Sequence, residues 1–175
     1  MPIFLLDAQE AINKFFNSGG PVLYLIAVLT FFLWLLILER LWFYNAGYRK
    51  FSRDIVSKWE SRSDRSSWYA GAIRNKLISE THMAINQNLS LIKTVIALCP
   101  LFGLLGTVTG MIEVFTVLSI TGGGDARSMA GGVSMATIPT MSGMVAALSG
   151  VFANIYISRK AARERELIEE KLVKV

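Results

Sequence analysis

Small residues at helical spacing inside a long apolar segment constrain the fold of this chain more than any other feature. Between Cys99 and Gly110 they recur at intervals of three and four, so they share one helix face: Gly103, Gly106, Thr107 and Gly110. Each glycine costs about 1 kcal/mol relative to alanine in a helix in water. In a bilayer, however, small residues let neighbouring helix backbones approach closely. The segment is predicted to be a membrane helix with a smooth, weakly polar face that packs against protein.

A second stripe of small residues follows further along the chain. Its members recur at intervals of four, three, four, three and four: Ala136, Thr140, Gly143, Ala147, Gly150 and Asn154. The two helices that carry these stripes are joined by a short link around Gly122-Gly123-Gly124, which predicts an antiparallel hairpin with Thr107 and Thr140 at similar depth. The stripes either only pack helix on helix or also present hydroxyls to a polar path. The pattern alone leaves both readings open.

Composition and charge distribution indicate a membrane protein. The 175 residues are 53% hydrophobic with a mean hydropathy of +0.45, more apolar than an ordinary soluble domain. Of 18 Lys and Arg, ten lie between Arg40 and Lys93 and six between Arg159 and Lys174. This asymmetry follows the positive-inside rule and favours lipid headgroups over nucleic acid as the partner of the basic segments. Cys99 is the single cysteine, so no intramolecular disulfide framework is expected.

The remaining chemistry-bearing residues form no recognisable active site. No nucleophile pairs with a base, and neither a metal-ligand spacing nor a phosphate loop is present, so we expect no enzyme, no metal and no cofactor. His82, the single histidine, is expected to be a solvated helix residue. Glu39 and Arg40 are expected to form a solvated or snorkelling pair at the inner membrane edge, or to contact a partner subunit.

Two motifs resemble a known family. Pro100-Leu-Phe-Gly-Leu-Leu-Gly-Thr107-Val-Thr-Gly110 and Gly132-Val-Ser-Met-Ala-Thr-Ile-Pro-Thr140-Met-Ser-Gly-Met-Val-Ala-Ala147 are similar to the second and third membrane helices of ExbB, a relative of TolQ and MotA. The resemblance implies a homopentameric ring around an ExbD-like single-span protein, with proton flow driving motion that a TonB-like protein delivers to outer-membrane transporters. It also implies that Thr107 and Thr140 face the pore. The alternatives are a TolQ-like role in envelope integrity and a passive membrane scaffold.

The predicted fold class is an all-α integral membrane protein of the bacterial inner membrane. It has three transmembrane helices, of which the second and third extend into the cytoplasm, plus an N-terminal amphipathic helix. The N-terminus is expected in the periplasm and the C-terminus in the cytoplasm. A break is predicted at residues 18–21, and one uninterrupted helix from about residue 72 to 119. The expected segments are a periplasmic amphipathic helix (1–20), the first transmembrane helix (21–44), a cytoplasmic loop and helical extension (45–90), the second transmembrane helix (91–120), a periplasmic link (121–128), the third transmembrane helix (129–157) and a cytoplasmic helical tail (158–175).

Two further residues of the predicted proton path come from less regular features. Asn154 closes the second stripe as a polar residue near the inner end of the third membrane helix. Many family members carry a glutamate where this chain has Met135, and Glu113 is expected at nearly the same depth on the neighbouring helix. Glu113 is therefore a candidate for a relocated proton-relaying acid. Its alternative roles are a position at the outer interface or a pair with Arg127. The loop between the first two helices is also short for the family.

Overall fold

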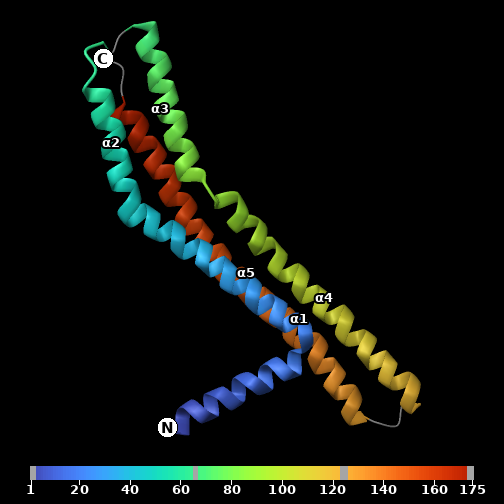
Figure 1. Cartoon of the computed structure of the whole chain (residues 1–175). Helices are drawn as coiled ribbons and strands as arrows, with labels where there is room; N and C mark the ends of the chain where they lie inside the picture. The colour runs from blue at the N-terminus through green and yellow to red at the C-terminus, as the bar shows by residue number, and fades with distance from the viewer. Residues whose placement is uncertain (1–2, 65–66, 123–125, 173–175) are drawn as a thin grey trace. The chain divides into compact units, whose positions relative to one another are not determined.

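The computed structural model describes residues 3–64, 67–122 and 126–172, and these form helices joined by short turns (Figure 1). In chain order the elements are α1 (Ile3–Trp42), the π-helical turn η1 (Phe43–Gly47), α2 (Tyr48–Glu60), α3 (Trp68–Asn86), α4 (Leu89–Thr121) and α5 (Ala126–Lys171). Three segments are long and apolar enough to cross a membrane: Gln9–Gly47, Trp68–Ile120 and Met129–Lys171. The predicted all-α class with three membrane helices is confirmed.

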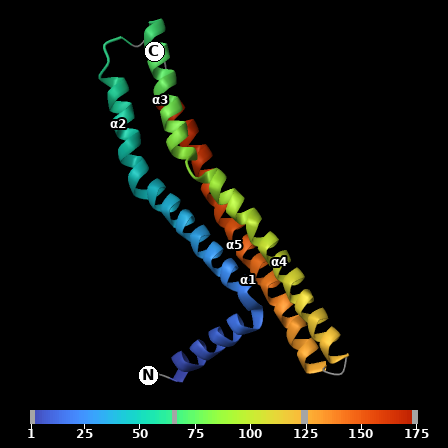
Figure 2. The ribbon, with the colours of Figure 1, turned by 45° about the vertical axis from the view of Figure 1, so that its right-hand side comes forward.

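The chain divides into two compact units, the first comprising residues 1–33 and 94–151. In this unit α4 and α5 run side by side in opposite directions (Figures 1 and 2). The predicted break at residues 18–21 is confirmed, because Gly20 has a φ of 66° and α1 changes direction there (Figure 2). Glycine adopts this left-handed backbone without a steric penalty, and Pro21 is suited to starting the next helical segment.

The second unit comprises residues 34–93 and 152–175. Its core brings α2, α3 and α5 together through five buried side chains: Ile55, Trp59, Ala70, Ile168 and Leu172. The helix α2 is not predicted from the basic, Ser-rich composition of this region, although Tyr48, Phe51, Ile55 and Trp59 recur at helical spacing. Its apolar face is short, and exposed charges such as Lys50, Arg53 and Lys58 surround it.

The predicted uninterrupted helix from residue 72 to 119 is wrong. α3 ends at Asn86 and α4 begins at Leu89, with an extended Gln87 (ψ 136°) and a left-handed Asn88 (φ 62°) between them. Asparagine tolerates the left-handed conformation better than most residues. The carbonyls that the break frees need new donors, and α1 supplies some of them, as described below.

Candidate functional site

The site is built on the close contact between α4 and α5. A Cβ atom on Gly143 would lie 2.5 Å from the carbonyl oxygen of Cys99, and one on Gly110 would lie 2.5 Å from the backbone nitrogen of Ala136. Both distances are shorter than real Cβ contacts, so only glycine fits there. The other stripe residues also lie where helices meet, as follows: Gly103 against Thr140, Gly106 against Pro139 and Val22, Gly150 against Ile96 and Leu33, and Ala136 and Ala147 buried.

The two predicted pore threonines lie at one edge of this interface. The Thr140 hydroxyl donates a hydrogen bond across the hairpin to the carbonyl oxygen of Gly103 at 2.8 Å. The half-buried Thr107 donates within its own helix, to the carbonyl oxygen of Leu104 at 2.6 Å. Thr140 therefore holds the two helices together, whereas Thr107 makes no described bond across the interface.

The first helix covers the opposite edge of the hairpin. A Cβ atom on Gly19 would lie 3.1 Å from the Ile138 side chain, and one on Gly20 would lie 2.9 Å from the Met135 side chain, both on α5. An apolar groove between α1 and α5 is lined by Leu23, Ile26, Ala27, Thr30, Met141, Ser142, Val145, Ala146 and Ser149. At about 100° per residue, these α5 positions centre on the side of the helix opposite Thr140. We call the edge of the hairpin away from α1, which carries Thr107 and Thr140, the threonine flank.

Glu113 and Met135 do not lie on the threonine flank. Glu113 is exposed and lies about 120° around α4 from Thr107, on the other side of the buried stripe. Met135 has its terminal methyl 2.9 Å from the position that a Cβ on Gly20 would occupy. Both residues therefore lie toward the edge that α1 covers. The Arg127 side chain, the alternative partner of Glu113, is outside the described residues.

Asn154 belongs to the second unit and is half-buried. Its side-chain oxygen accepts a hydrogen bond from the Ser158 hydroxyl at 3.5 Å, one helical turn further along α5.

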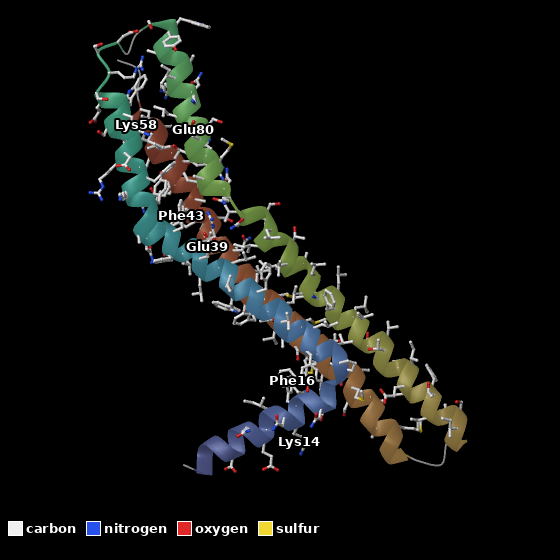
Figure 3. All side chains as sticks on the ribbon, in the orientation of Figure 1. Lys14, Phe16, Glu39, Phe43, Lys58 and Glu80 are labelled. Carbon is white, nitrogen blue, oxygen red and sulfur yellow. The ribbon has the colours of Figure 1, made fainter. Side chains whose placement is uncertain are left out.

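A buried arginine holds the break between α3 and α4. The Arg40 side chain is 2% exposed, and its Nε and Nη2 atoms donate to the Glu39 carboxylate at 2.7 and 2.8 Å. Its Nη1 donates to the Ala84 carbonyl at 3.3 Å, and its guanidinium carbon lies 5.0 Å from the centre of the Phe43 ring. Figure 3 labels Glu39, near the end of α1, and Phe43, the first residue of η1. The predicted solvated or snorkelling pair is wrong for Arg40, which is buried.

The two charges match the two helix ends at the break. The guanidinium lies at the C-terminus of α3, where a cation is favoured. The Tyr44 hydroxyl donates to the next carbonyl there, that of Ile85, at 2.7 Å. The carboxylate of Glu39 accepts from the Asn88 side-chain nitrogen at 3.4 Å, beside the N-terminus of α4, where an anion is favoured. Sequence reasoning missed this cluster because its members are separated by more than forty residues.

His82 is only partly solvated, where the sequence predicts a solvated residue. Its Nε2 atom lies 3.1 Å from a carboxylate oxygen of Glu169, and its side chain is only 31% exposed. Arg74 donates to the carbonyl oxygens of Glu169 and Leu172, and Arg165 donates to the Asn86 side chain. These contacts join α3 to α5. Among the described residues, no three His, Cys, Asp or Glu side chains are grouped as a metal site would require.

A buried tyrosine joins α2 to α5 in the same unit. The Tyr48 hydroxyl donates to the Glu164 carbonyl oxygen at 3.1 Å. Burial, followed by the nearby negative charge of Glu164, raises the pKa of Tyr48 to about 12.

Comparison with known proteins identifies the family. A sequence model of the MotA/TolQ/ExbB proton channel family matches residues 45–170, which is more than half of the chain. The chain belongs to this family. With its three long apolar helices, it is a multi-pass membrane protein of the ExbB type. No solved structure matches it.

Relatives with the ExbB name match parts of the chain. The putative biopolymer transport protein ExbB-like 1 of Synechocystis is 51% identical over 61 residues, which are 33% of this chain and 24% of the relative. ExbB-like 3 of the same organism is 37% identical over 84 residues, 46% of this chain and 40% of the relative. The biopolymer transport protein ExbB of Helicobacter pylori is 30% identical over 84 residues, 48% of this chain and 58% of the relative. The matched regions thus span between a quarter and three fifths of these relatives.

Proposed function

We propose that this chain is the ring-forming subunit of a proton-driven motor in the bacterial inner membrane. In this proposal, copies of the chain surround the membrane helices of an ExbD-like single-span partner, and the motion is passed to a TonB-like protein that energises outer-membrane transport. Three relatives that match parts of the chain carry the ExbB name, and a TolQ-like role in envelope integrity is the alternative. The observation that carries the proposal is the threonine flank of a close-packed hairpin in a chain of the proton channel family.

The chemistry of the threonine flank suits a proton path. A hydroxyl both donates and accepts hydrogen bonds, so it can hold a water or an acid in either protonation state. The surrounding side chains on this flank are exposed and apolar: Leu104, Val108, Met111, Val133, Met144, Leu148 and Val151. A wall of this kind, once covered by a partner helix, excludes bulk water and leaves the hydroxyls as the polar groups. The glycine contacts behind it keep the wall rigid.

The proposed orientation places the N-terminus in the periplasm and the C-terminus in the cytoplasm. The second unit contains sixteen of the 18 Lys and Arg residues, and the first unit contains only Lys14 and Arg127. This asymmetry supports a cytoplasmic location for the second unit. The proton path through the first unit would then cross the apolar core of the membrane.

Proton flux through the whole complex tests the proposal. The chain is purified together with a co-expressed ExbD-like single-span protein and reconstituted into vesicles with an internal pH dye and a potassium diffusion potential. We expect flux above that of empty vesicles, loss of flux in Thr107→Val and retention in Thr107→Ser, because valine keeps the β-branched shape without the hydroxyl. An assembled wild-type complex with no flux would favour a passive scaffold.

A further inference from the structure

We infer that Thr137 supplies a third hydroxyl to the proton path, one helical turn outward from Thr140. The inference rests on the proposed function and adds a residue that the stripe pattern omits. Thr137 is exposed, and its hydroxyl bonds only within its own helix, to the carbonyl oxygens of Val133 at 3.1 Å and Ser134 at 3.3 Å. An exposed hydroxyl on an apolar membrane helix is available to water or to a partner.

The register of the hairpin places Thr137 beside Thr107 in depth. Gly106 meets Pro139 at one level, and Gly110 meets Ala136 one turn further outward. Between these two contacts α4 carries Thr107 and α5 carries Thr137. At 1.5 Å per residue the two threonines lie within about 3 Å of each other along the hairpin axis. Thr140 lies just inside this interval, so the three hydroxyls fall within about one helical turn.

Thr137 also lies on the same side of the α5 axis as the threonine flank. The first helix approaches α5 at Met135 and Ile138. Around the helix axis, Thr137 lies about 160° from Met135 and about 100° from Ile138. Thr137 therefore lies on the side of α5 that α1 leaves open, as Thr140 does.

The hydroxyls of Thr137 and Thr140, both on α5, differ in their hydrogen-bond partners. The Thr140 hydroxyl proton is committed to the Gly103 carbonyl on the other helix, so turning it away would break a contact within the hairpin. The Thr137 hydroxyl can rotate without loss of any described contact between helices, since threonine in a helix populates two χ1 rotamers. Thr137 and Thr107 thus act as the hydroxyls that reorient as a proton passes along bound water, and Thr140 acts as a fixed one.

The chain offers a matched control at Thr109. This residue is also exposed, and its hydroxyl also bonds within its own helix, to the carbonyl oxygens of Leu105 and Gly106, both at 3.1 Å. It lies about 160° around α4 from Thr107, away from the threonine flank. Thr109→Val therefore removes the same group at similar exposure but outside the proposed path.

The test measures proton flux in vesicles containing the complex of this chain with its single-span partner. We expect Thr137→Val to lower the flux roughly two- to tenfold, the equivalent of one lost hydrogen bond, with Thr137→Ser and Thr109→Val at the wild-type rate. Native mass spectrometry confirms equal assembly. A conducting wild type with Thr137→Val as active as Thr109→Val overturns the inference and leaves the proposed function standing. A wild type without flux overturns the proposed function itself.

A second measurement decides the case in which Thr137→Val does not assemble. In a Cys99→Ala background, Thr137→Cys and Thr109→Cys are treated with methanethiosulfonate ethylammonium, a small water-borne thiol reagent. Labelling of Thr137→Cys, with loss of flux and with Thr109→Cys unlabelled, supports a hydrated path at Thr137. An unlabelled Thr137→Cys in a conducting complex, or equal labelling of both, overturns it.

Discussion

Replacing Arg40 by alanine should destabilise the second unit by about 2.5–4 kcal/mol. The change removes a charge-assisted hydrogen bond to the Ala84 carbonyl, worth about 1.5–3 kcal/mol, and the contact with the Phe43 ring, worth about 1 kcal/mol. The ion pair adds little, because Glu39 is 42% exposed and its carboxylate can be rehydrated. For the same reason the larger penalty for breaking a fully buried pair does not apply.

Hydrogen exchange of the purified protein in detergent measures this effect where it should be largest. Amides at the end of α3 and the first turn of α4 should exchange roughly two orders of magnitude faster in Arg40→Ala, since tenfold corresponds to about 1.4 kcal/mol. Arg40→Lys keeps the charge but not the planar guanidinium, so its amide exchange rates should lie between those of the wild type and Arg40→Ala. Arg163→Ala, an exposed arginine of the same unit, is the control. If Arg40→Ala exchanges like Arg163→Ala, the capping role assigned to Arg40 is refuted.

Three further predictions concern the helix contacts, Glu113 and Tyr48. Gly143→Val should prevent stable folding because its Cβ meets backbone atoms, whereas Gly131→Val, with nothing within 4 Å, should fold normally when both are compared by thermal unfolding. Because Glu113 lies off the threonine flank, Glu113→Gln should keep most of the energised uptake in an assembled complex. Loss of uptake that adding Met135→Glu partly restores would instead support Glu113 as the relocated proton-relaying acid. Tyr48 keeps its proton until about pH 12 in the folded chain, whereas a tyrosine in the unfolded chain loses it near pH 10. The free energy of unfolding should therefore be unaffected below pH 10 and then fall by up to about 1.4 kcal/mol per pH unit. Tyr48→Phe should reduce this slope.

The sequence predicts the features that depend on local pattern. The spacing of Gly103, Gly110 and Gly143 indicated close helix contacts, and glycine next to proline indicated the break at residues 18–21. The break at Gln87–Asn88 was missed because nothing nearby interrupts the helical pattern. Its stabilising contacts come from Arg40 and Tyr44, more than forty residues earlier. Tertiary contacts here override local helix propensity.

The same limit applied to the candidate site. The stripes indicated which threonines share a face, but they could not show which hydroxyls are committed to packing. That distinction depends on the register of the hairpin, which places the Gly103 carbonyl within reach of Thr140 and leaves Thr107 bonded to its own helix.

The mass of the intact complex tests the central claim most directly. The chain, co-expressed with an ExbD-like single-span protein and extracted in mild detergent, is analysed by native mass spectrometry. The account predicts one discrete closed homo-oligomer, with five copies as the family resemblance implies, carrying at least one copy of the partner. Each chain exposes an apolar threonine flank that this account assigns to contacts with other chains or the partner. A stable monomer, or a series of open-ended assemblies without the partner, would contradict the account.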